Sequence, residues 1–125
     1  MKILLDTNFV LTCVRQGIDF ISLADEIFDV KIEWLVADEV IEELRMLSMR
    51  KESKGKEKEA AKLGLELLER LDAERIRLKN PNVDDGIVAY SQNHDVVVAS
   101  LDKGLKKRIK GKIMTIQGKN RINIV

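Results

Sequence analysis

The sequence contains only one cysteine, one histidine and one proline among its 125 residues, and no apolar run approaches the ~20 residues of a membrane-spanning helix. Because Cys13 stands alone, it cannot form an internal disulfide, and the apolar pattern around it predicts a small core residue. His94 has no histidine partner for acid–base catalysis, and its place at the end of an expected helix predicts a surface position. These absences exclude a disulfide-stabilised scaffold and paired-histidine chemistry.

Two common kinds of ligand site are also missing from the sequence. There is no glycine-rich phosphate-binding loop, and no Cys/His cluster that would indicate zinc. The chain opens directly on an apolar run, without a basic segment and a cleavage site, so we expect no signal peptide and a cytoplasmic location. The length, with 45% apolar and 34% charged residues, predicts one globular domain over residues 1–125.

Apolar runs alternate with helical patterns along the chain. The expected strands cover residues 2–5, 34–36, 75–78, 96–100, 113–116 and 122–125. The expected helices cover residues 8–15, 20–28, 40–47, 57–72, 84–93 and 103–110. This alternation predicts the α/β class, as a three-layer α/β/α sandwich with a central, mainly parallel sheet.

Several local features refine this expectation. Asp19 and Asp38 are expected to cap the second and third helices. The charged residues 49–58 predict a mobile loop or a fraying helix end, and Gly118-Lys119-Asn120 predicts the turn between the last two strands. The buried stripe expected for the helix at 57–72 consists of Leu63, Leu67, Leu68 and Leu71.

Two aspartates directly follow apolar strands. Asp6 ends the run from Met1 to Leu5, and Asp102 ends the run from Val96 to Leu101. The carboxyl ends of parallel strands share one edge of a sheet, where ligands collect near a topological switch point. We therefore expect Asp6 and Asp102 at that edge.

Helix geometry selects two further carboxylates. Glu43 lies roughly 90° from the centre of the apolar face of its helix, whereas Glu42 lies roughly 165° away, so Glu43 can reach inward. Asp84 shares a helix face with the core residues three and four places later, whereas Asp85 is turned about 100° away. An N-cap role for Asp84 is the main alternative.

Four carboxylates gathered at one place would repel one another, and a hard divalent cation relieves that repulsion. Because all the candidate ligands are oxygens, the expected ion is Mg²⁺ or Mn²⁺. The small or polar residues placed to orient the ligands or nearby water are Asn8, Ser100 and Asp85. After Asp102 the chain carries eight basic residues and no acidic one, which suits a polyanion held at such a site, although a solvated face is the simpler interpretation.

The same residues resemble the PIN domain family over essentially the whole chain. The motifs that carry the resemblance are Leu4-Leu5-Asp6-Thr7-Asn8, Val40-Ile41-Glu42-Glu43-Leu44, Asp84-Asp85-Gly86-Ile87-Val88-Ala89 and Ser100-Leu101-Asp102. The resemblance implies an α/β/α nuclease that binds one or two Mg²⁺ or Mn²⁺ ions and hydrolyses single-stranded RNA. It places Asp6, Glu43, Asp84 and Asp102 on the four acidic positions of the family. The residues expected to contact the RNA backbone are Lys103, Lys106, Lys107 and Arg108.

Two branches of the family fit the sequence. The length and the opening residues resemble archaeal VapC-like toxins, which implies a small antitoxin protein as partner and a homodimer or tetramer. The Asp84-Asp85 doublet and the basic tract from Leu105 to Ile109 resemble the branch that processes ribosomal RNA.

Other classes of protein remain as alternatives. A phosphatase of the haloacid dehalogenase type would need a second aspartate where this chain has Asn8. A receiver-like phosphoacceptor domain would explain clustered aspartates but would not need Glu43. A non-catalytic RNA-binding scaffold would have no use for four mutually repelling carboxylates.

Overall fold

A computed structural model describes residues 1–51 and 55–125 of the chain. In these ranges one sheet has the strand order β3-β2-β1-β4-β5-β6. The strands are β1 (Lys2–Leu5), β2 (Glu33–Ala37), β3 (Glu74–Ile76), β4 (Val97–Ala99), β5 (Ile113–Gln117) and β6 (Arg121–Ile124). The pairs β1–β2, β1–β4, β2–β3 and β4–β5 are parallel, and β5–β6 is an antiparallel hairpin.

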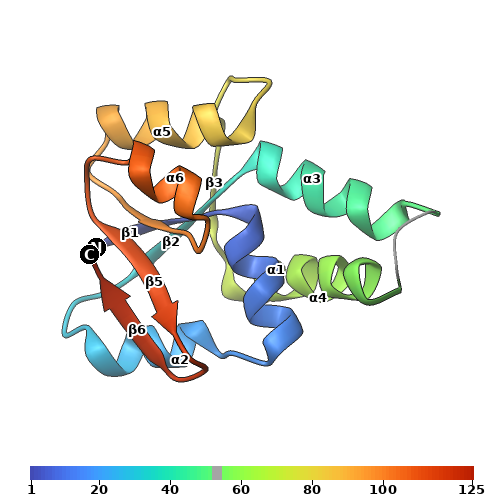
Figure 1. Cartoon of the computed structure of the whole chain (residues 1–125), viewed down its shortest axis with the longest axis horizontal. Coiled ribbons are helices and arrows are strands. Elements are labelled where there is room, and N and C mark those ends of the chain that lie inside the picture. The colour runs from blue at the N-terminus through green and yellow to red at the C-terminus, as the bar shows by residue number, and fades with distance from the viewer. Residues whose placement is uncertain (52–54) are drawn as a thin grey trace.

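The helices cover both faces of this sheet (Figure 1). They are α1 (Thr7–Gln16), α2 (Phe20–Ile27), α3 (Asp38–Met49), α4 (Gly55–Leu71), α5 (Val83–Asn93) and α6 (Lys103–Arg108). Successive residues of a strand point to opposite faces, so Ile3 and Leu5 pack in the core with α1 to α4. Leu4 packs in the second core with α5 and α6. The predicted three-layer sandwich with a mainly parallel sheet is therefore confirmed.

Several single-residue predictions are also confirmed. Cys13 is fully buried in the larger core, and burial raises the pKa of its thiol to about 12. His94 is exposed at the C-cap of α5, where its ring stacks on Tyr90. Asp19 caps α2 by accepting a hydrogen bond from the backbone N–H of Ser22.

In the described ranges no helix is both long and apolar enough to cross a bilayer.

The predicted N-cap of α3 is wrong. Ala37 occupies the cap position without a side-chain hydrogen bond, and Asp38 lies in the first turn of the helix. The Asp38 carboxylate accepts a hydrogen bond of 2.8 Å from Arg75 Nε and lies 3.5 Å from Arg77 Nε. Arg75 in the edge strand β3 and Arg77 just after it therefore bind the carboxylate of Asp38, which makes no capping hydrogen bond to the backbone of α3.

The predictions for α4 need two corrections. The helix begins at Gly55, which shortens the predicted loop at 49–58, and residues 52–54 of that loop lie outside the described residues. Leu63, expected in the buried stripe, is 52% exposed. The buried residues of α4 are Ala60, Ala61, Gly64 and Leu68. A Cβ atom at Gly64 would lie 3.1 Å from Val10 Cγ1, so α4 approaches α1 along its small residues and turns Leu63 outward.

Candidate active site

The candidate site starts at the point where the strand order reverses. β1 pairs with β2 on one side and with β4 on the other, so the carboxyl ends of β1 and β4 flank a topological switch point. Asp6 directly follows β1, and its backbone N–H donates to the carbonyl oxygen of Ala99 at 3.1 Å. Asp102 lies three residues beyond β4 as the N-cap of α6. The starts of α1, α3, α5 and α6 face this region in Figure 1.

Ser100 connects the two aspartates. Its side chain is fully buried, and its Oγ donates a hydrogen bond of 3.3 Å to Asp6 Oδ2. The same Oγ accepts a hydrogen bond of 3.1 Å from the backbone N–H of Asp102. Ser100 therefore holds both the Asp6 carboxylate and the backbone of Asp102 through its side chain, and its role at a metal site stays a prediction.

Asp6 is a buried carboxylate with carboxylate neighbours. It is 3% exposed. Burial is the largest cause that raises the pKa of Asp6 to about 7, followed by the charge of Asp84 and, more weakly, that of Asp102. The hydrogen bonds from Ser100 and from the backbone of Thr7 oppose this rise but do not cancel it. The site therefore concentrates negative charge where little water can screen it.

Glu43 reaches the same region from α3. It is partly buried, whereas Glu42 beside it is exposed, as helix geometry predicted. Glu43 Oε1 accepts a hydrogen bond of 3.3 Å from Thr7 Oγ1. Burial raises the pKa of Glu43, the Thr7 hydrogen bond lowers it, and the charge of Asp84 raises it further. Sequence reasoning missed Thr7, because a threonine at the first position of a helix has no feature that marks a partner far along the chain.

Asp84 and Asp85 lie in the first turn of α5. The N-cap is Asn82, whose Oδ1 accepts from the backbone N–H of Asp85 at 2.9 Å, so the alternative N-cap role of Asp84 is wrong. Asp84 is partly buried, and its charge acts on both Asp6 and Glu43. Asp85 is exposed and pairs with Arg108 of α6 at 2.6 Å, so its orienting role at a metal site stays a prediction.

The remaining predicted residues lie around this region with different surroundings. Asn8 is exposed in the first turn of α1. Lys103 and Lys107 are exposed on α6, whereas Lys106 Nζ donates to Thr115 Oγ1 at 3.4 Å. Arg108 is held by Asp85. The basic face of α6 thus begins directly after Asp102, beside the acidic residues.

The acidic residues offer the types of ligand atom that a divalent cation such as Mg²⁺ or Mn²⁺ prefers. The donors are carboxylate and hydroxyl oxygens. Burial first, and then the charges of Asp84 and Asp102, raise the pKa of Asp6, and a bound cation would neutralise those like charges. In the part of the chain that the structure describes, no group of three or more His, Cys, Asp or Glu side chains is arranged to hold a metal ion. The side chains therefore face one region without forming a complete set of ligands.

Known proteins resemble this chain in sequence and in structure. The family model described as "PIN like domain" matches residues 3–120. "Ribonuclease VapC4" of Methanocaldococcus jannaschii is 30% identical over 109 residues, which cover 86% of this chain and 82% of that protein. The solved structure of the PIN domain endonuclease Utp24 matches with a TM-score of 0.79 and 24% identity, over 98% of this chain and 90% of that one. At that identity, the likeness to Utp24 supports the fold alone.

Proposed function

This chain belongs to the PIN domain family, and from that premise we propose that it is a divalent-metal-dependent endoribonuclease of the VapC-like kind, acting on single-stranded RNA. The observation that carries the proposal is the buried Asp6 carboxylate at the switch point between β1 and β4, with Asp84 and Asp102 as like-charged neighbours. A fold that only needed stability would not keep this arrangement, because burying a repelled charge costs free energy.

Each acidic residue has a proposed role. Asp6, Asp84 and Asp102 would hold Mg²⁺ or Mn²⁺, and Glu43 would complete the site or position water. When bound, such an ion lowers the pKa of water and neutralises charge that develops on the phosphate. Ser100 orients Asp6, and Thr7 orients Glu43, through the hydrogen bonds described above.

The basic residues of α6 have a separate proposed role. Lys103, Lys106, Lys107 and Arg108 would contact RNA phosphates, which gives affinity without sequence selection. Asp85 holds Arg108 at 2.6 Å and would thereby orient its guanidinium.

The test is cleavage of labelled single-stranded RNA in Mg²⁺, in Mn²⁺ and in EDTA. We expect cleavage with either metal and none in EDTA. Asp6→Asn removes one ligand charge and is expected to abolish cleavage, whereas Asp25→Asn, an exposed change on α2, is the matched control and should cleave normally. Undiminished cleavage by Asp6→Asn, or cleavage in EDTA, would contradict the proposal. RNA binding without turnover in Mn²⁺ would favour a non-catalytic scaffold.

A ribosomal-RNA-processing nuclease is the second candidate within the family. The observation that favours it is the ion pair between Asp85 and Arg108, which joins the two sequence features typical of that branch. Substrate choice separates the candidates in the same assay. A processing enzyme should cut a ribosomal RNA precursor at one site, whereas a VapC-like toxin, whose partner would be a small antitoxin protein, should not prefer the precursor over mature RNA.

A further inference from the structure

Glu39 of α3 is a glutamate that is not one of the four acidic residues proposed for the active site. It stands one helical turn before Glu43. Its Oε1 accepts the backbone N–H of Leu78 at 3.1 Å, and its Oε2 accepts the backbone N–H of Lys79 at 2.9 Å. Both oxygens of Glu39 are therefore used by a backbone segment that is 39 and 40 residues away in the sequence.

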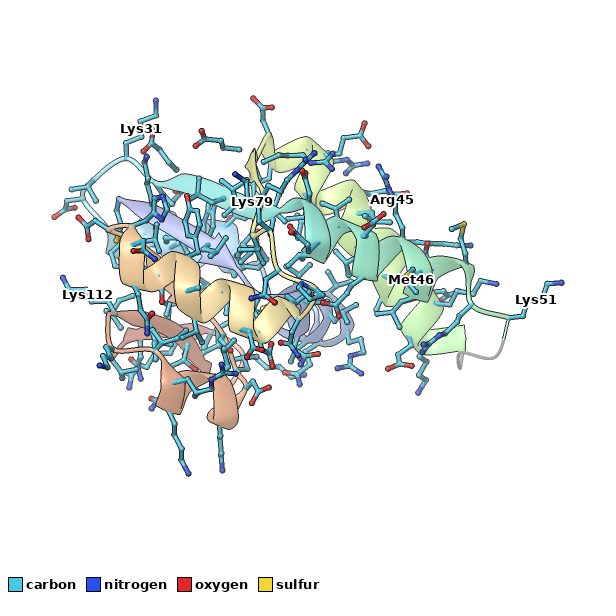
Figure 2. The ribbon with its side chains drawn as sticks, turned by 90° about the horizontal axis from the view of Figure 1, so that it is seen from above. Lys31, Arg45, Met46, Lys51, Lys79 and Lys112 are labelled. Carbon is cyan, nitrogen blue, oxygen red and sulfur yellow. The ribbon has the colours of Figure 1, made fainter. Side chains whose placement is uncertain are left out.

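That backbone segment connects β3 to α5. Lys79 lies there with a φ of +58°, in the left-handed region that costs a residue other than glycine free energy. Two hydrogen bonds to a charged acceptor stabilise this conformation. In the view from above, Lys79 lies close to the start of α3 (Figure 2).

The connection in turn supports the first turn of α5. A Cβ atom at Gly86 would lie 2.9 Å from Leu78 Cβ and 3.2 Å from Asn80 Cβ, so α5 packs directly on the segment that Glu39 holds. Asn80 Oδ1 also accepts from the backbone N–H of Asn82, the N-cap of α5. Asp84 lies between this N-cap and Gly86.

We infer that Glu39 is a positioning residue for Asp84: by holding the backbone of Leu78 and Lys79, it sets the place of the first turn of α5 relative to α3. Helix α3 then carries Glu43 into the site and also anchors the segment that brings Asp84 there. The link to metal binding rests on the function proposed above. Because both carboxylate oxygens of Glu39 accept backbone N–H groups, Glu39 is not proposed as a metal ligand.

The experiment compares Glu39→Ala with Glu42→Ala. Glu42 is the matched control, because it is an exposed glutamate of the same helix and its loss changes the net charge equally. Amide hydrogen exchange is measured at Leu78, Lys79 and Gly86, relative to Leu4 in the central strand β1, and Mn²⁺ binding is measured by titration calorimetry. Glu39→Ala should exchange at these three amides about tenfold faster and bind Mn²⁺ about tenfold more weakly, since bonds to charged acceptors are the strong ones. Glu42→Ala should match the wild type in both measurements.

The outcomes separate this inference from the proposed function. Wild-type exchange at Gly86 in Glu39→Ala, or faster exchange with unchanged Mn²⁺ affinity, would overturn the inference. Equal Mn²⁺ binding by the wild type and Asp6→Asn would overturn the proposed function, and exchange at Gly86 would still decide whether Glu39 holds α5. If Glu39→Ala does not fold, Glu39→Gln keeps one acceptor oxygen and should give an intermediate effect on both measurements; wild-type values there would overturn the inference.

Discussion

Asp6 is a carboxylate placed where almost no water reaches it. A buried side chain at the start of α1 would stabilise the fold best if it were neutral, because burial and the charges of Asp84 and Asp102 all disfavour its ionised form. A residue that opposes stability in this way is typical of a functional site, where activity is kept at the expense of the fold. At the scale of one residue, stability and function therefore make opposite demands.

This opposition predicts that Asp6→Asn stabilises the metal-free protein. Asparagine has nearly the same shape and keeps an oxygen that can accept the hydrogen bond from Ser100, but it carries no charge. At pH 8 in EDTA the free energy of unfolding should rise by on the order of 1 kcal/mol, the size of one pKa unit of unfavourable interaction. Urea denaturation followed by circular dichroism measures it, with Asp25→Asn as the exposed control. A less stable Asp6→Asn would mean that the carboxylate supports the fold.

Helix geometry was sufficient to orient single residues but not to find their partners. It predicted correctly that Glu43 is more buried than Glu42, and Asp84 more than Asp85, because the angle between neighbouring residues of a helix is constant. It could not find the contact of Thr7 with Glu43, 36 residues away. Nor could it find the hydrogen bonds of Glu39. Both depend on the packing of α3 against other elements, which no local pattern encodes. The roles of the four acidic residues remain predictions.

At the scale of elements, helix ends are where local rules fail. Asp38 precedes a helical pattern just as Asp19 does, yet only Asp19 is an N-cap. The difference is tertiary, because Arg75 and Arg77 are close enough to Asp38 to hold its carboxylate. The misplaced stripe of α4 has a similar cause: Gly64 lets α4 approach α1 closely, and this contact decides which leucine is buried.

Helix α6 depends on a residue that we also propose as a metal ligand. Asp102 Oδ1 accepts the backbone N–H of Gly104 at 2.8 Å and that of Leu105 at 3.3 Å, so Asp102 is the N-cap of α6. Asparagine caps helices as well as aspartate does, whereas alanine does not. Substitution at this position can therefore separate the structural role from the catalytic one.

We predict that Asp102→Asn abolishes RNA cleavage in Mn²⁺ while the free energy of unfolding stays within about 0.5 kcal/mol of the wild type. Asp102→Ala should abolish cleavage and also lose about 1 kcal/mol of stability, because the cap is removed. Chemical denaturation and the RNA assay, run on both variants, test the two parts. Full cleavage by Asp102→Asn would show that this residue serves α6 alone.

At the scale of the whole molecule, the alternation of strands and helices predicted the layers. Gly118 lies in the predicted turn between the last two strands, and the structure shows that this turn joins β5 and β6 as an antiparallel hairpin. The strand order could not be predicted in this way. After β3 the chain crosses to the other side of β1, and this reversal is what puts Asp6 and Asp102 at one switch point. Strand ends indicated the edge of the sheet, whereas the order of the strands decides which ends are neighbours.

Charge is also distributed over the whole molecule in a way that net charge hides. The chain has a formal net charge of +1, yet no acidic residue follows Asp102, and α6, which begins directly after Asp102, carries the exposed Lys103 and Lys107. Lys112, another of the basic residues that follow Asp102, lies at the opposite end of the molecule from Lys51, which stands just beyond the C-terminal end of α3 (Figure 2). RNA phosphates should therefore bind at the α6 side, where their charge faces cations and the proposed metal site.

Salt dependence of RNA binding tests this placement. Each phosphate neutralised on a single strand contributes about −0.7 to the slope of log K against log salt, so the double variant Lys103→Gln/Lys107→Gln should reduce the slope by about 1.4. The matched control is Lys56→Gln/Lys62→Gln, which removes the same charge from exposed positions of α4, in the other helical layer. Fluorescence anisotropy of labelled single-stranded RNA in EDTA, from about 50 to about 200 mM KCl, measures binding without cleavage. The control should keep the wild-type slope, because α4 covers the face of the sheet opposite to α6. Equal slopes for the two double variants would mean that α6 does not contact the RNA backbone.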